Sequence, residues 1–164
     1  MSIRDRITDL RRVPASELIA NPLNWRRHPQ SQSDALKGVL DAIGFADAVI
    51  ARETPDGLEL IDGHLRKEVM GDQPVPVLIV DVTEEEADKM LLTLDPLAMM
   101  ANADQDQFLA LLQNAEFESQ AIFDMLGALV EMPPMLGDEL DETLADGVQL
   151  CKCEDCGHEH HKQA

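Results

Sequence analysis

Short apolar segments of strand length and of helix length alternate over the first 95 residues, and this alternation restricts the fold more than any other feature. The first two strand-like segments are separated by Glu53-Thr54-Pro55-Asp56-Gly57, a composition typical of a tight turn, which predicts a β-hairpin. Because strands are few and two of them form a hairpin, the sequence predicts an α+β domain with a small mixed β-sheet and packed helices, rather than a doubly wound parallel fold. We expect strands at residues 48–52, 58–61 and 75–82, and helices at 33–43 and 64–70.

The segments after residue 82 are predicted to be helical. Thr83 and Glu86 form the capping-box pattern that begins a helix, and Pro96 is expected to end that helix. Asp104 is the expected N-cap of the next helix, and a further helix is expected from about Ser119 to Val130. The sequence thus predicts a domain at 8–100, a helical extension at 101–132, an acidic linker at 133–148 and a Cys/His tail at 149–164.

Charge is unevenly distributed between the two halves of the chain. Residues 1–80 carry 10 basic and 12 acidic side chains, a net charge of −2, whereas residues 81–164 carry 3 basic and 20 acidic side chains, a net charge of −17. The total of −19 argues against a protein that wraps nucleic acid by neutralising its phosphates, so nonspecific DNA binding is not expected. Any polyanion site is expected in the first half. The acidic half is interpreted as a solubilising surface, with DNA mimicry as the alternative.

Membrane insertion and secretion are not predicted. No stretch reaches 18 consecutive apolar residues, and the charged N-terminal residues lack the apolar region of a secretory signal. We therefore expect a cytoplasmic protein, whose three cysteines are in a reducing environment.

The junction between the expected strand at 58–61 and the expected helix at 64–70 is the best candidate for chemistry. Gly63 permits a positive φ and a close approach of ligand to backbone. The free N–H groups of the first helical turn favour an anion, and His64 and Arg66 can add side-chain donors. These residues predict a phosphate-binding turn. An ordinary strand-to-helix turn with exposed His and Arg is the alternative.

The same stretch carries a family resemblance. Asp62-Gly63-His64-Leu65-Arg66-Lys67-Glu68-Val69 resembles the Gly-x-x-Arg-x-x-Ala box of ParB N-terminal domains, in the ParB/sulfiredoxin-like superfamily. Asn21-Pro22 followed by Arg26 and Arg27 is similar to the first box of that family. The resemblance extends over about residues 12–112 and is strongest to short ParB-like domains found in phages and beside DNA methyltransferases.

The resemblance implies a nucleoside triphosphate site, for CTP or another NTP with Mg²⁺. Carried over to this sequence, Gly63, His64 and Arg66 would cradle the phosphates, and Arg26 and Arg27 would approach from the first box. It further implies a role in DNA metabolism, a DNA-processing protein as partner, and a homodimer as one possible assembly.

Three features depart from the family pattern. Leu94-Asp95-Pro96-Leu97 stands where partition proteins have a box with Asn and Arg, which weakens the case for metal-assisted CTP hydrolysis. No basic helix-turn-helix follows, so specific DNA binding is not expected. Position 65 is Leu where sulfiredoxins need Cys, which excludes reductase chemistry.

The leading hypothesis is therefore a ParB-like nucleotide-binding accessory protein. A ParB-like nuclease is one alternative, with Asp62 and Glu68 as the carboxylates nearest the turn, and an acidic adaptor or DNA mimic is another. Nothing in the sequence requires an enzyme.

All three cysteines lie in the tail, close to several histidines. Cys153 and Cys156 have the Cys-x2-Cys spacing of a zinc knuckle and are the first candidate Zn²⁺ ligands. Cys151 and His158 are the next candidates, with His161 as a substitute for either. The alternatives are a disulfide and a tail with adventitious metal affinity.

Overall fold

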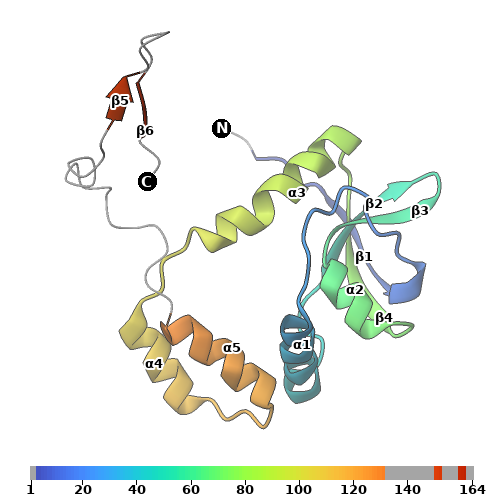
Figure 1. Cartoon of the computed structure of the whole chain (residues 1–164). Coiled ribbons are helices and arrows are strands. Elements are labelled where there is room, and N and C mark those ends of the chain that lie inside the picture. Colours follow the sequence, from blue (N-terminus) through green and yellow to red (C-terminus); the bar gives the residue numbers. More distant parts are fainter. Residues whose placement is uncertain (1–2, 132–149, 153–158, 162–164) are drawn as a thin grey trace. The chain divides into compact units, whose positions relative to one another are not determined.

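The computed structural model describes residues 3–131, 150–152 and 159–161. The chain forms two compact units, Met1–Pro133 and Pro134–Ala164. In the second unit, β5 (Leu150–Lys152) pairs antiparallel with β6 (Glu159–His161) (Figure 1).

The first unit is built on one four-stranded sheet (Figure 1). Its strands are β1 (Ile7–Pro14), β2 (Val49–Thr54), β3 (Gly57–Asp62) and β4 (Pro74–Val80), arranged in the order β1-β4-β2-β3. β2 pairs with β4 in parallel, while β1–β4 and β2–β3 are antiparallel. The predicted mixed sheet and the predicted hairpin are both confirmed.

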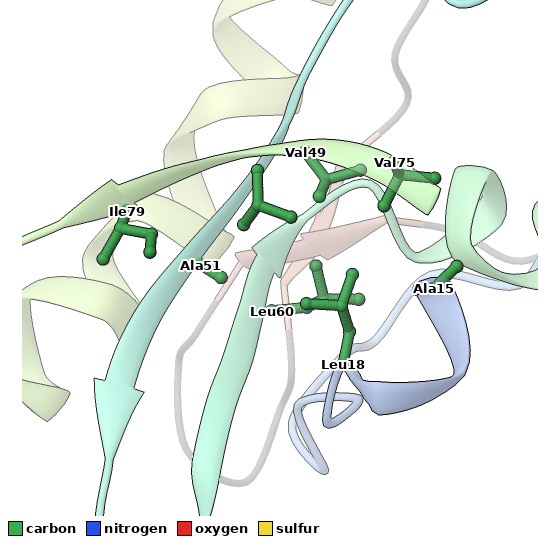
Figure 2. Packing of buried hydrophobic residues seen from close by; sticks show 8 residues of the cluster. Ala15, Leu18, Val49, Ala51, Leu60, Val75 and Ile79 are labelled. Atoms are coloured by element: carbon green, nitrogen blue, oxygen red, sulfur yellow. The ribbon is translucent and has the colours of Figure 1, made fainter. Parts of the chain in front are cut away.

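The sheet buries apolar side chains on both of its faces. Leu60 belongs to a cluster on one face, together with the 3₁₀ turn η1 (Ala15–Glu17), as Figure 2 shows. The next residue, Ile61, belongs to a second cluster that includes Leu91 of α3 (Glu84–Met99). Because successive strand residues point to opposite faces, β3 contributes to both clusters. The two-sided burial fixes β3, and therefore the residues that follow it.

Four further helices complete the described part of the first unit. α2 (His64–Met70) follows β3 directly, and α1 (Gln30–Ile43) packs against α5 (Gln120–Glu131). α4 (Gln105–Asn114) begins at the expected N-cap, because Asp104 Oδ1 accepts a hydrogen bond from the Gln107 N–H at 3.1 Å.

Two helix boundaries differ from prediction. α1 begins at Gln30 rather than Ser33, because the carbonyl of Pro29 accepts hydrogen bonds from Gln32 and Ser33 and no side-chain cap is used. α3 begins with the predicted capping box at Thr83 but continues through Pro96 to Met99. Pro96 lies in the last turn, where proline removes a single backbone hydrogen bond and the remaining helix is short.

None of the helices described in the chain is long and apolar enough to cross a membrane.

Candidate functional site

A pocket of about 320 Å³ lies in the first unit, between the loop that precedes α1 and the helices α1, α2 and α3. Two arginines line it: Arg26 comes from the loop before α1, and Arg66 comes from α2. Much of its apolar lining comes from Trp25, Leu36, Val39 and Leu91. A volume of this size is in the range of small-ligand sites. The remaining lining residues are Asn24, His28, Gln32, Ala35, Ile61, Asp62, Gly63, His64, Leu65, Asp95 and Met125.

Gly63 turns the chain from β3 into α2 with φ at 100° and ψ at 23°, a left-handed conformation that favours glycine. A Cβ built on Gly63 would lie 2.7 Å from the Cβ of Val49, so the position excludes larger residues for a second reason. The backbone of this turn therefore approaches both β2 and the pocket closely.

Arg66 is held by two carboxylates. Its guanidinium donates to Asp62, the last residue of β3, and to Asp47, in the segment before β2. Its Nε is buried and has no hydrogen-bond partner among the residues that the structure describes. A buried guanidinium N–H without a partner is costly, because a donor that has lost water is left unsatisfied. The two carboxylates thus fix the guanidinium of a residue that lines the pocket, while its Nε–H stays unpaired within the described part of the chain.

The loop from Asn21 to Arg26 is ordered by its own side chains. Asn21 Oδ1 accepts from the Leu23 N–H at 2.8 Å, and the Asn21 carbonyl accepts from the Asn24 N–H at 3.1 Å across Pro22. Asn24 Oδ1 in turn accepts from the Arg26 N–H at 3.3 Å. These turns direct the next two residues, Trp25 and Arg26, into the pocket.

Trp25 and Arg26 connect this loop to α3. The indole Nε1 donates to the Leu91 carbonyl at 3.2 Å, and the Arg26 guanidinium lies 5.2 Å from the centre of the Trp25 ring. Arg26 Nε is 2.6 Å from Asp95 Oδ2, although its N–H is not directed at that oxygen. Trp25 therefore anchors the loop and supports the arginine.

His64 is buried, and its Nε2 accepts a hydrogen bond from the Asn21 N–H. This bond requires an unprotonated Nε2, which places the proton of the neutral ring on Nδ1. Burial lowers the pKa of His64, and the nearby carboxylates of Asp62 and Glu68 oppose that shift. The site therefore offers two cationic arginines and a neutral imidazole, a set suited to binding an anion.

Four of the five predicted phosphate-binding residues line this one pocket, namely Gly63, His64, Arg66 and Arg26. Arg27 is exposed and is not among the lining residues. The carboxylates of Asp47 and Asp95 were not predicted as site residues. The one sequence signal for Asp95 is its place in Leu94-Asp95-Pro96-Leu97, the stretch that departs from the family pattern.

The predicted metal ligands Cys153, Cys156 and His158 lie outside the described residues. The other two, Cys151 and His161, lie in β5 and β6, and the strand register places Cys151 opposite His160.

No protein-family model matches the sequence, and no curated protein matches it. Solved structures do. The C-terminally truncated chromosome-partitioning protein ParB from Caulobacter crescentus, complexed with CTP-γ-S, is similar over 85% of this chain and 86% of that chain, with 15% sequence identity and a TM-score of 0.55. Sulfiredoxin from Arabidopsis thaliana is similar over 51% of this chain and 98% of that chain, with 17% identity and a TM-score of 0.43.

The chain shares the fold of the Caulobacter ParB, in agreement with the ParB-like fold that the sequence predicted. The short phage or methyltransferase-associated subtype stays a prediction.

Proposed function

We propose that this chain is a ParB-like accessory protein of DNA metabolism that binds a nucleoside triphosphate in the pocket between the Asn21–Arg26 loop and α2. The observation that supports it is the convergence of Arg26 and Arg66 on one cavity beside the Gly63 turn. These two arginines come from segments 40 residues apart and meet only in the folded chain.

The pocket is suited to the two chemically different parts of a nucleotide. The guanidinium groups match phosphate oxygens, to which arginine donates paired hydrogen bonds. The apolar surfaces of Leu36, Val39 and Leu91 are suited to the base and sugar, and the Trp25 ring offers a face for stacking. CTP is the first nucleotide to test, because the Caulobacter ParB of the same fold was crystallised with CTP-γ-S.

Isothermal titration calorimetry with CTP, ATP, GTP and UTP in the presence of Mg²⁺ tests this proposal. We expect one nucleotide to bind, and Arg66→Ala to weaken it by roughly 1.5–3 kcal/mol, the usual contribution of a hydrogen bond to a charged group. Lys67→Ala is the matched control, since it removes the same charge from the neighbouring position of α2, outside the pocket lining. Absence of binding by all four nucleotides would contradict the proposal.

We also propose that the tail binds one Zn²⁺. The antiparallel pairing of β5 with β6 supports this, because its register brings Cys151 opposite His160. Elemental analysis of protein purified without an affinity tag tests the proposal. We expect about one Zn²⁺ per chain, and a value below roughly 0.2 would show a tail with adventitious affinity only.

The strongly acidic second half fits a DNA-processing protein with a basic surface as partner better than naked DNA.

A further inference from the structure

Asp95 reaches the pocket from α3 and is paired with Arg26, which the loop before α1 supplies. Asp95 Oδ2 lies 2.6 Å from Arg26 Nε, and the two side chains are 37% and 26% exposed. The pair therefore crosses the pocket wall between two separate elements, and it is only partly accessible to water.

The charges of the pocket are balanced by the protein itself. Arg66 is bound by Asp62 and Asp47, and Arg26 is paired with Asp95, so three carboxylates accompany two guanidiniums. Such a pocket is not strongly cationic before a ligand enters. A phosphate that binds Arg26 comes close to the Asp95 carboxylate, so two anions then share the charge of one guanidinium and repel each other.

Two of these three carboxylates, Asp62 and Asp95, line the pocket, and Asp95 is the one that pairs with an arginine from a separate segment of the chain. Asp62 is four residues from Arg66 in the same strand-to-helix segment, and Asp47 is 62% exposed and does not line the pocket. Asp95 lines the pocket and belongs to a different element from the arginine it neutralises.

We propose that Asp95 is a specificity-determining residue of the pocket, whose carboxylate competes with the ligand's phosphates for Arg26. This inference rests on the proposed function, since it concerns the same nucleotide site. Asp95 lowers the affinity for a ligand in proportion to the phosphate charge placed beside it. Neutralising Asp95 is therefore expected to leave the affinity for an uncharged nucleoside unchanged and to raise the affinity for a triphosphate.

The competition also connects the ligand to α3. Asp95 and Leu91 are four residues apart on this helix, and Leu91 accepts the hydrogen bond from the Trp25 indole. Trp25 is the only tryptophan of the chain, which has no tyrosine. Its fluorescence therefore reports on this contact without interference from other residues.

The test compares the full-length protein with Asp95→Asn, which keeps the size of the side chain and removes its charge. CTP with Mg²⁺ and cytidine are titrated into both proteins, with calorimetry and Trp25 fluorescence as the two readouts. Glu85→Gln is the matched control, because it removes one negative charge from α3 outside the pocket lining. Asp95→Glu keeps the charge, and circular dichroism verifies that each variant is folded.

We expect Asp95→Asn to bind CTP about fivefold more tightly than the wild type, the fold-change that corresponds to a partly exposed ion pair worth about 1 kcal/mol. Cytidine binding is expected to stay the same, and Asp95→Glu and Glu85→Gln are expected to resemble the wild type. If the wild type binds CTP and Asp95→Asn binds it no more tightly, the role of Asp95 is refuted while the proposed function stands. An equal gain for cytidine also refutes the role. If CTP, ATP, GTP and UTP bind neither protein, the proposed function fails, and this inference fails with it.

Discussion

His64 accepts a hydrogen bond from the backbone N–H of Asn21, with 3.2 Å between Nε2 and N, although 43 residues separate the two positions in the sequence. Both residues are buried. Asn21 begins the loop that carries Arg26, and His64 directly follows the Gly63 turn. The hydrogen bond thus fixes the two motifs against each other. With Nε2 engaged, the imidazole has only Nδ1–H to donate to a phosphate.

This bond predicts a loss of stability in mild acid. Burial lowers the pKa of His64 in the folded chain, so below its ordinary pKa the unfolded chain binds more protons than the folded one. The contribution of His64 is fully present above about pH 6.5 and is lost as the pH falls toward the lower folded pKa. Urea unfolding between about pH 7.5 and pH 5.5 measures it. His64→Gln is expected to flatten this dependence, and an unchanged slope in the variant would contradict the assignment.

A second acid-sensitive contact joins Arg6, the residue before β1, to α3. Arg6 donates to both carboxylate oxygens of Glu86, at 2.9 and 2.7 Å, and the Thr83 N–H donates to the same carboxylate. These bonds, with Arg6 as the largest cause, lower the pKa of Glu86 to about 2. A lowered carboxyl pKa stabilises the folded state above the ordinary pKa of Glu.

That stabilisation is lost as the pH falls from about 4.5 toward 2. Glu86→Gln is therefore expected to have a weaker dependence of unfolding free energy on pH in this range than the wild type. Glu84→Gln, at an exposed position of the same helical turn, is the control. If both variants follow the wild-type curve, Glu86 does not contribute in the way proposed.

Much of the fold could be predicted from local sequence. The hairpin turn at Glu53–Gly57, the glycine at 63 and the capping box at Thr83 each depend on residues within a few positions of one another, and each was confirmed. Local chemistry sets these features because the interacting groups are neighbours in the chain.

The charge balance of the pocket could not be predicted in this way. Asp95 lies 69 positions from Arg26, and no periodicity or spacing connects them. The family pattern directed attention to the arginines, while Asp95 was interpreted only as the loss of an expected box. Likewise, the end of α3 at Met99 could not be predicted from Pro96 alone. Proline is expected to end a helix, but here the last turn continues for three residues beyond it.

Gly63→Ala is expected to destabilise the chain by about 1–3 kcal/mol, because the residue has φ at 100° and its new Cβ would overlap the Val49 side chain. Gly71→Ala is the control. Gly71 also has a positive φ, at 58°, but a Cβ there meets nothing within 4 Å, so only the backbone term of roughly 1 kcal/mol applies. Thermal or urea unfolding of both variants measures the difference. Equal losses would show that close packing against β2 is not important at Gly63.

The contact between α1 and α5 gives two glycine substitutions with opposite expected signs. A Cβ on Gly38 would lie 2.7 Å from the Ser119 Cβ and 3.2 Å from Ile122 Cδ1, so Gly38→Ala is expected to push α5 away from α1 and to destabilise the folded state by about 1–3 kcal/mol.

Gly127, in α5, has nothing within 4 Å of its Cβ position, so Gly127→Ala is expected to stabilise the helix by roughly 0.5–1 kcal/mol through its higher helix propensity. Urea unfolding of the two variants beside the wild type tests the pair. A stabilising Gly38→Ala would mean that the close approach of α1 to Ser119 does not persist in solution. A destabilising Gly127→Ala would mean that this face of α5 packs against a surface in solution, where the added methyl group meets a neighbour.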